Sequence, residues 1–189
     1  MKRQPPPRRP ALLALLALAL VLAAPPAAAK SPQAEPLPES LTFTTLDGEK
    51  LVLADLRGKV VLLDFWATWC KPCRNAVPHL RRLAQRMEDQ PFELVGVSVD
   101  GNEEALRRYL EEEGVTWTQI WDPSNQSSEV FGIKSYPFYL VIDHEGRPAS
   151  VVRGWGGSSG RTLDAAVGRE VRRAKKAAKR AAKQARVEG

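Results

Sequence analysis

The sequence predicts an α/β domain whose central sheet is buried on both faces. Strand-like and helix-like segments alternate along most of the chain, which is typical of this class. Residues 60–67 (VVLLDFWA) are apolar almost throughout, as expected for a strand covered on both sides. Residues 71–89 instead repeat apolar residues at a helical period. With 189 residues, 43% of them hydrophobic, the chain can form one sizeable core and is not collagen-like, rod-like or fully disordered.

The predicted elements begin with a short hairpin, in which Leu41–Thr44 and Lys50–Leu53 flank a turn at Asp47–Gly48. The remaining elements are a strand at Val60–Ala67, a helix at Lys71–Asp89, a strand at Glu93–Val99, a helix at Asn102–Glu113, a strand at Thr116–Trp121, a short helix at Ser127–Phe131, and strands at Phe138–Asp143 and Ser150–Arg153. A turn at His144–Gly146 makes the last two strands antiparallel. No internal repeat is visible.

The first 29 residues are typical of an export signal. A cationic start precedes the apolar run Ala11–Ala24, and the small residues Ala27–Ala29 follow it. Fourteen apolar residues are too few for a comfortable membrane span. We therefore expect an exported protein, periplasmic or otherwise extracytoplasmic. Retention of residues 1–29 as an uncleaved membrane tether is the alternative.

The rest of the chain divides into three parts. Residues 30–40 are polar and interrupted by prolines, which predicts a flexible linker. Residues 41–168 form the expected domain. Residues 169–189 are rich in Ala, Lys and Arg and predict a basic helical tail.

The tail has a weak apolar seam opposite its cationic face. The seam residues follow a helical spacing and are Val167, Val171, Ala174, Ala178, Ala181 and Ala185. Because alanine buries little area, the favoured interpretation is a solvated helical extension. The alternative is attraction to anionic lipid, envelope polymer or an acidic partner.

The net charge of +6 comes from the two ends of the chain. Between Lys30 and Gly168 there are 15 basic and 20 acidic residues. The domain itself is therefore mildly acidic, so we expect no nucleic-acid partner on it. We expect a monomer.

The two cysteines, Cys70 and Cys73, carry the candidate chemistry. They are the only ones, so a framework of several disulfides is excluded. They lie where a buried strand ends and a helix begins, and a helix N-terminus favours a thiolate. Cys70 is then the attacking sulfur, and Cys73, one turn further, can resolve a mixed disulfide. Lys71 adds a nearby positive charge, and Pro72 suits the first turn of a helix.

Half of a structural zinc site would show the same spacing. Zinc would need two further ligands. The sequence offers His79, His144 and carboxylates but no second Cys-x-x-Cys pair, and the expected exported setting permits redox chemistry at the cysteines. We therefore expect no metal and no cofactor.

Two segments give the chain a family resemblance. Residues 64–73 read DFWATWCKPC, with Pro78 shortly after, and residues 135–143 read SYPFYLVID, followed by HEGRP. Residues 37–168 resemble the thioredoxin superfamily, and more closely the exported thiol-disulfide oxidoreductases of the TlpA/ResA type. The resemblance implies a thioredoxin-like fold: a central mixed sheet flanked by helices, here with an N-terminal β-hairpin extension.

The resemblance also implies a substrate site. It places a cis Tyr136–Pro137 peptide bond against the two sulfurs, in a loop whose backbone pairs with an extended substrate. Tyr136 is then expected to frame this site, and Trp69 to form part of its apolar rim.

Asp64 interrupts an otherwise apolar strand, where a buried carboxylate is costly. In the thioredoxin pattern this position is a buried acid behind the second cysteine. The resemblance thus implies a raised pKa and a general-base role towards Cys73, whereas an edge-facing, solvated Asp is the alternative. The chain departs from the family pattern at two positions. Ala76 stands where ResA-like relatives commonly have an acid, and Gly96 stands near the position of the lysine that accompanies the buried acid in thioredoxins.

For function, the resemblance favours an enzyme that exchanges electrons with protein disulfides. Relatives of this type usually reduce selected extracytoplasmic cysteines, including the haem-attachment thiols of apocytochromes c, with electrons from a membrane thiol donor. A copper-binding chaperone of thioredoxin fold is the alternative, although such proteins space their cysteines one residue further apart. A thiol peroxidase is disfavoured because Leu63 and Ala67 replace the proline and threonine of its motif.

Overall fold

The structure is a computed structural model that describes residues 35–188. The expected export signal and residues 30–34 of the expected linker lie outside the described residues. The elements in chain order are β1 (Thr42–Thr44), β2 (Lys50–Val52), a 3-10 helix η1 (Leu53–Leu56), β3 (Val60–Trp66), α1 (Lys71–Arg86), β4 (Phe92–Ser98), α2 (Glu103–Glu112), β5 (Thr118–Trp121), α3 (Gln126–Val130), β6 (Phe138–Ile142), β7 (Pro148–Arg153) and α4 (Ser159–Glu188).

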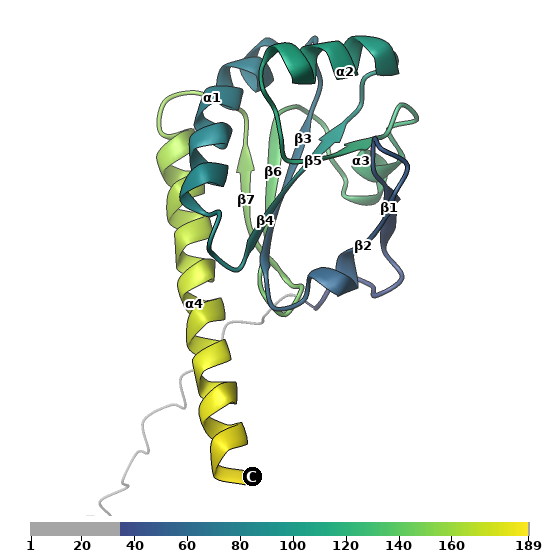
Figure 1. The fold of residues 1–189 in the computed structure, drawn as a ribbon. Coiled ribbons are helices and arrows are strands. Elements are labelled where there is room, and N and C mark those ends of the chain that lie inside the picture. The colour runs from purple at the N-terminus through teal and green to yellow at the C-terminus, as the bar shows by residue number, and fades with distance from the viewer. Residues whose placement is uncertain (1–34, 189) are drawn as a thin grey trace, which may run out of the picture. The chain divides into compact units, whose positions relative to one another are not determined.

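Five strands form one mixed sheet in the order β5-β4-β3-β6-β7 (Figure 1). β3, β4 and β5 are parallel, whereas β6 runs antiparallel to β3, and β7 antiparallel to β6. The central strand β3 is buried at all seven positions, as its apolar sequence predicts. β1 and β2 pair separately as an antiparallel hairpin. The predicted mixed sheet with flanking helices and an N-terminal hairpin is therefore confirmed.

Two apolar layers cover the two faces of this sheet. On one face, Leu62 of β3 and Tyr139 of β6 pack against residues of α1 and α4 such as Leu80 and Leu163. The other face packs against β1, η1 and the segment around α3; its buried residues are Phe43, Leu53, Val61, Leu63, Phe65, Val95, Val97, Ile120, Ile133, Phe138, Leu140 and Ile142. Because successive strand residues point to opposite faces, Asp64 shares the face of Leu62, under the helices.

The domain's contacts begin before Leu41, where the sequence placed its start. The Leu37 amide donates to the Gly146 carbonyl oxygen at 2.9 Å, and the Leu37 side chain packs against the core. The proline-containing segment is therefore held to the domain at Leu37, beside the β6–β7 turn.

The expected boundary between residues 168 and 169 falls inside α4, which is continuous from Ser159 to Glu188. Burial against the domain continues to Ala174. Of the predicted seam, Val167, Val171 and Ala174 are buried, but Ala178, Ala181 and Ala185 are exposed. The helical tail is present, and its first turns belong to the core. Within residues 35–188, none of the helices combines the length and the apolar character needed to cross a bilayer.

Candidate active site

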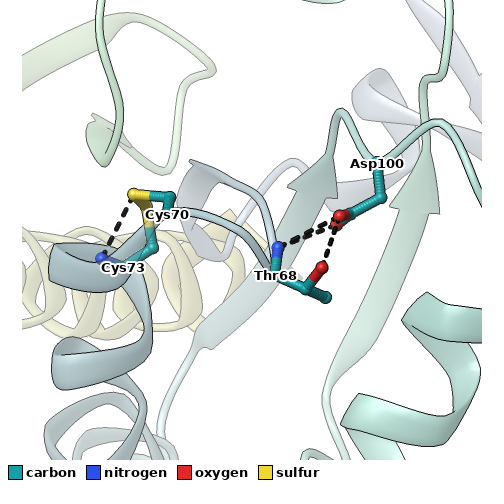
Figure 2. Close-up of a disulfide and its surroundings, with 4 residues drawn as sticks. All are labelled: Thr68, Cys70, Cys73 and Asp100. Carbon is teal, nitrogen blue, oxygen red and sulfur yellow. Dashed lines mark hydrogen bonds between the residues drawn. A yellow bond between two sulfur atoms is a disulfide. The ribbon is translucent and has the colours of Figure 1, made fainter.

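Cys70 and Cys73 form a disulfide at the N-terminus of α1, with their Cα atoms 5.2 Å apart (Figure 2). Cys70 is the N-cap residue in an extended conformation, and its Sγ accepts a hydrogen bond from the Cys73 amide at 3.3 Å. A first-turn amide and the helix dipole both stabilise negative charge at that sulfur. The predicted position of Cys70 at the helix tip is thus observed.

The neighbouring motif residues lie as the sequence predicts. Pro72 occupies the first turn of α1, where its missing amide hydrogen costs no helical bond. Lys71 is exposed, so solvent screens its charge. Cys70 and Cys73 are 6% and 3% exposed. Both cysteines are therefore largely shielded from solvent.

Asp100, just after β4, fixes the loop that carries Cys70. Its carboxylate accepts hydrogen bonds from the Thr68 amide at 3.0 Å and the Thr68 hydroxyl at 2.6 Å (Figure 2). The Ser98 hydroxyl donates to the same carboxylate at 2.7 Å, and the Trp121 indole donates to the Asp100 carbonyl oxygen. Sequence reasoning missed this residue because Thr68 and Asp100 are 32 positions apart. A lone acid at the end of a buried strand was the available signal.

Asp64 lies deep under α1, at 4% exposure. Burial raises the pKa of its carboxyl to about 8, because the low-dielectric interior disfavours the charged form. Its Oδ1 atom has no hydrogen-bond partner among the described residues. The buried position and the raised pKa match the prediction, and the solvated alternative is wrong.

Across the strands from Asp64, the structure has the neutral side chain of Gln119 and no lysine. Asp64 pairs with Gly96 on β4, and Gly96 pairs with Gln119 on β5. A β-carbon at Gly96 would collide with the Gln119 side chain, so glycine is what lets this amide lie across β4. The Gln119 Oε1 atom accepts from the Trp66 indole at 3.1 Å. No cation in this row offsets the charge of an ionised Asp64.

Trp69 and Tyr136 meet beside the cysteines. Trp69 is 64% exposed, and its ring lies edge-on to that of Tyr136, with centroids 6.1 Å apart. Tyr136 packs against the cluster that contains Cys70 and Cys73, and the Tyr136–Pro137 peptide bond is cis. The structure therefore brings together the aromatic pair that the resemblance implied.

Two residues that sequence reasoning missed hold the Tyr136 phenol in place. Its hydroxyl donates to the Asn125 Oδ1 atom at 2.6 Å and lies 2.9 Å from the fully buried Ser128 hydroxyl. Asn125 adopts a left-handed conformation with φ of 59°, which asparagine tolerates better than most residues. The first backbone amides of α3 donate to the Asp122 carboxylate and not to Asn125. The Asn125 side-chain oxygen is therefore free to accept from the Tyr136 hydroxyl.

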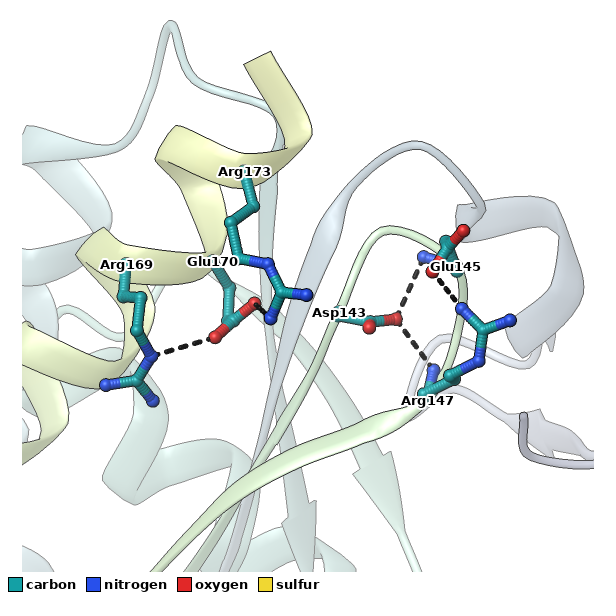
Figure 3. A network of polar contacts seen from close by, with 6 residues as sticks. All are labelled: Asp143, Glu145, Arg147, Arg169, Glu170 and Arg173. Carbon is teal, nitrogen blue, oxygen red and sulfur yellow. Dashed lines mark hydrogen bonds and ion pairs between the residues drawn. The ribbon is translucent and has the colours of Figure 1, made fainter. Parts of the chain in front are cut away.

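Both histidines lie apart from the sulfurs. His79 forms a hydrogen bond to Asp164 of α4 at 2.9 Å, which links α1 to α4, and its ring packs against Trp155. His144 lies in the β6–β7 turn, where the neighbouring Asp143 accepts the Glu145 and Arg147 amides (Figure 3). Among residues 35–188, no three His, Cys, Asp or Glu side chains gather closely enough to hold a metal ion.

A mixed sheet with a Cys-x-x-Cys disulfide at a helix tip and a nearby cis-proline defines the thioredoxin-like class of proteins. Residues 34–148 match the AhpC/TSA family, and the chain belongs to that family. The match includes both cysteines, Asp64 and the cis-proline loop.

Curated relatives and solved structures agree on the type within this class. The chain is 31% identical over 108 residues to the thiol-disulfide oxidoreductase ResA of Bacillus subtilis, covering 57% of this chain and 60% of that one. It is 29% identical over 115 residues to the ResA of Bacillus thuringiensis, covering 61% and 66%. The chain thus spans just under two thirds of the length of these relatives.

Among solved structures, a thiol:disulfide interchange protein of the thioredoxin family from Chlorobium tepidum superposes with a TM-score of 0.64 at 25% identity. The superposition covers 75% of this chain and 99% of that one. The resemblance to TlpA/ResA-type proteins, drawn from DFWATWCKPC and SYPFYLVID, is therefore confirmed.

Proposed function

We propose that this protein is an exported thiol-disulfide oxidoreductase that exchanges electrons with protein disulfides through Cys70 and Cys73. The observation that carries the proposal is the disulfide at the tip of α1, in which the Cys73 amide donates to the Cys70 sulfur. That hydrogen bond also stabilises a thiolate once the disulfide opens. The names of the ResA relatives support the same activity.

In the reducing direction the proposed cycle has two exchanges. The Cys70 thiolate attacks one sulfur of a substrate disulfide, forms a mixed disulfide and expels the other substrate sulfur as a thiolate. Cys73 then loses its proton and attacks the Cys70 sulfur. This closes the Cys70–Cys73 disulfide and releases the second substrate thiolate, so that two electrons have passed to the substrate.

Asp64 is the proposed acceptor of the Cys73 proton. Its pKa of about 8 lies near the ordinary thiol value of about 8.5. Proton transfer between groups of matched pKa is close to balanced in either direction, which favours reversible general-base catalysis. An ordinary solvated aspartate, with a pKa near 4, would be too weak a base.

Trp69, Tyr136 and Pro137 are the proposed substrate-binding residues. An exposed tryptophan beside an anchored tyrosine presents apolar area next to the sulfurs, and such aromatic side chains are frequent anchors for partner chains. The backbone after Tyr136 would pair with an extended substrate segment, as the family resemblance implies.

The finer role we propose is reduction of extracytoplasmic cysteines in cytochrome c maturation, with electrons from a membrane thiol donor. The apolar run in residues 11–24 supports export. The thiolate-stabilising helix tip is compatible with either direction of exchange, so the potential of the pair decides the direction. A difference of 30 mV corresponds to about 1.4 kcal/mol.

The deciding experiment equilibrates the protein with glutathione buffers of graded potential and quantifies the free thiols. A value near −270 mV, as for thioredoxin, is expected for a reductant, whereas one near −120 mV would make the protein an oxidant of the DsbA kind. Thiols that stay inert at every potential would refute the proposal altogether.

A trapping experiment then identifies the substrate. The Cys73→Ala variant should accumulate a mixed disulfide through Cys70, whereas the matched Cys70→Ala variant should trap far less. An oxidised peptide with the haem-attachment cysteines of an apocytochrome c should react faster than oxidised insulin. Equal rates would remove the cytochrome c role and leave a general oxidoreductase.

A further inference from the structure

The C-terminal half of α4 presents a one-sided basic surface. Beyond Ala174, every residue of α4 is exposed except the half-buried Ala177. This stretch of 14 residues contains six Lys or Arg, one acid, and Val187 as its only large apolar side chain. The helix therefore extends past the core without an apolar face that could pack against anything.

The basic residues share one side of the helix. Each residue of an α-helix is rotated by roughly 100° from the last, so the basic positions from Arg169 to Arg186 fall within an arc of roughly 160°. The buried residues Leu163, Val167 and Ala174 lie on the opposite side. The domain thus holds α4 with its basic side outward.

Glu170 forms ion pairs with two of the nine basic residues between Arg169 and Arg186. It is 1% exposed, and its carboxylate binds the Arg169 Nε and Arg173 Nη1 atoms, each at 3.0 Å (Figure 3). The other seven basic residues of this stretch have no ion-pair partner in the described part of the chain. We call these seven the basic face: Arg172, Lys175, Lys176, Lys179, Arg180, Lys183 and Arg186.

We propose that the basic face docks the protein onto a bilayer surface rich in anionic phospholipid headgroups. A row of like charges on one side of a straight helix complements a flat, uniformly negative surface. Because the helix offers alanine where an inserting helix would offer Leu, Phe or Trp, it adsorbs by charge and does not insert. Docking of this kind is reversible and sensitive to salt.

The same observations argue against an acidic protein or a nucleic acid as the occupant. A stable protein interface needs a packed core with aromatic or large apolar anchors, which this surface lacks. A helix inside a DNA groove is enclosed by both groove walls, whereas the first turns of the basic face are backed by the domain. The proposal does not rest on the oxidoreductase activity.

The test compares variants of the full chain in vesicle co-sedimentation. The first variant replaces Lys176, Lys179, Lys183 and Arg186 by Gln, which removes charge from the basic face and keeps a good helix former. The matched control replaces four exposed basic residues elsewhere that make no ion pair among residues 35–188, namely Lys50, Arg82, Arg108 and Lys134. Because residues 1–29 are the same in all three proteins, differences in vesicle binding between them report on the substituted residues.

The wild type should bind vesicles of mixed phosphatidylcholine and phosphatidylglycerol more tightly than vesicles of phosphatidylcholine alone. Each basic residue near such a surface contributes about a fivefold gain in binding. The helix variant should therefore bind about 100-fold or more weakly, and the control within about threefold of the wild type. Raising the salt from about 0.1 M to about 1 M, which shortens the Debye length from about 10 Å to about 3 Å, should release the wild type.

Three results would overturn the proposal. Equal binding of the wild type to both kinds of vesicle would show that charge plays no part. An equal loss in the helix variant and the control would assign the effect to overall charge. Tight binding to duplex DNA with no preference for anionic vesicles would make nucleic acid the occupant. Circular dichroism of the helix variant must show unchanged helix content, so that loss of binding is not loss of fold.

Discussion

Asp64 and Tyr139 lie directly opposite each other on β3 and β6, and neither the Asp64 Oδ1 atom nor the Tyr139 hydroxyl has a hydrogen-bond partner among the described residues. Both side chains are buried. Burial raises the pKa of Tyr139, and the nearby Asp64 charge raises it further. Two residues with unsatisfied polar atoms thus occupy paired positions beneath the helix that carries the cysteines. Such atoms cost stability, so each calls for an explanation such as a functional role.

Replacing Asp64 by Asn should slow the second exchange and leave the first nearly unchanged. Asn keeps the shape of the side chain but cannot accept the Cys73 proton, and removal of a general base typically costs about 10²- to 10⁴-fold. In rapid-mixing experiments the mixed disulfide through Cys70 should therefore accumulate. Asp143→Asn, at the far end of β6, is the matched control. Equal slowing of both exchanges would mean that Asp64 acts on the fold and not on Cys73.

Asp64 should also make the oxidised protein less stable as the pH rises from about 4 to about 8. In this range the folded protein keeps a proton on Asp64, because its pKa is raised from 3.8 to about 8, while the unfolded chain has released it. Stability conferred by that proton is complete below pH 4 and falls by up to about 1.4 kcal/mol per pH unit. Urea unfolding at graded pH should show this slope in the wild type. Asp64→Asn should lack it and be more stable at pH 7, and parallel curves would contradict the prediction.

The Tyr139→Phe variant should be as stable as the wild type or more stable, by up to about 1 kcal/mol. Removing a buried hydroxyl that has no partner removes a desolvation cost and leaves ring packing intact, including the contact with Trp155. Urea unfolding at pH 5, where Asp64 is protonated, measures this directly. A loss of more than about 2 kcal/mol would show instead that the hydroxyl is satisfied by a buried water.

The elements and the cysteine geometry could be predicted because their signals are local. The apolar run 60–67 and the helical period after Lys71 each lie within one segment, and together they place Cys70 at a strand-to-helix junction. Asp64 was also predictable, because a lone acid in a buried strand is costly wherever that strand lies. Each of these inferences needs only the residues within about one element of the feature.

The parts that escaped prediction depend on contacts between distant segments. Glu170 belongs to the tail that was expected to be a solvated helical extension, but α4 packs on the sheet with this residue buried. The exposed Ala178, Ala181 and Ala185 continue a regular seam, yet the core ends at Ala174. The support that Asp100 gives to Thr68 follows from the pairing of β3 with β4, which no local pattern specifies.

Replacing Asp100 by Ala should destabilise the protein by about 2–4 kcal/mol and slow the reaction of Cys70. The change leaves the Thr68 amide and the Ser98 hydroxyl without their charged acceptor. Asp143→Ala, which removes the acceptor of two turn amides far from the sulfurs, is the control for stability. Only Asp100→Ala should alter the alkylation rate of Cys70 in the reduced protein. If Cys70 were alkylated at the same rate in both variants, Asp100 would contribute to stability alone and not to the reactivity of Cys70.

Tyr136→Phe should weaken binding of protein substrates and spare small disulfides. Without its hydroxyl, the ring loses its bonds to Asn125 and Ser128 and can swing away from Trp69. The KM for an oxidised protein should rise by about threefold to tenfold, the equivalent of one hydrogen bond, while kcat and the rate with a small aromatic disulfide change little.

The matched variant for this test is Asn125→Gly, because glycine adopts the left-handed backbone at position 125 without strain and removes the acceptor for the Tyr136 hydroxyl. If Asn125 acts through Tyr136, the Tyr136→Phe/Asn125→Gly double variant should have the same KM as Tyr136→Phe alone, because both single changes break the same hydrogen bond. Additive effects would show that the two residues contact the substrate independently. A fall in kcat with an unchanged KM would place Tyr136 in the exchange step itself.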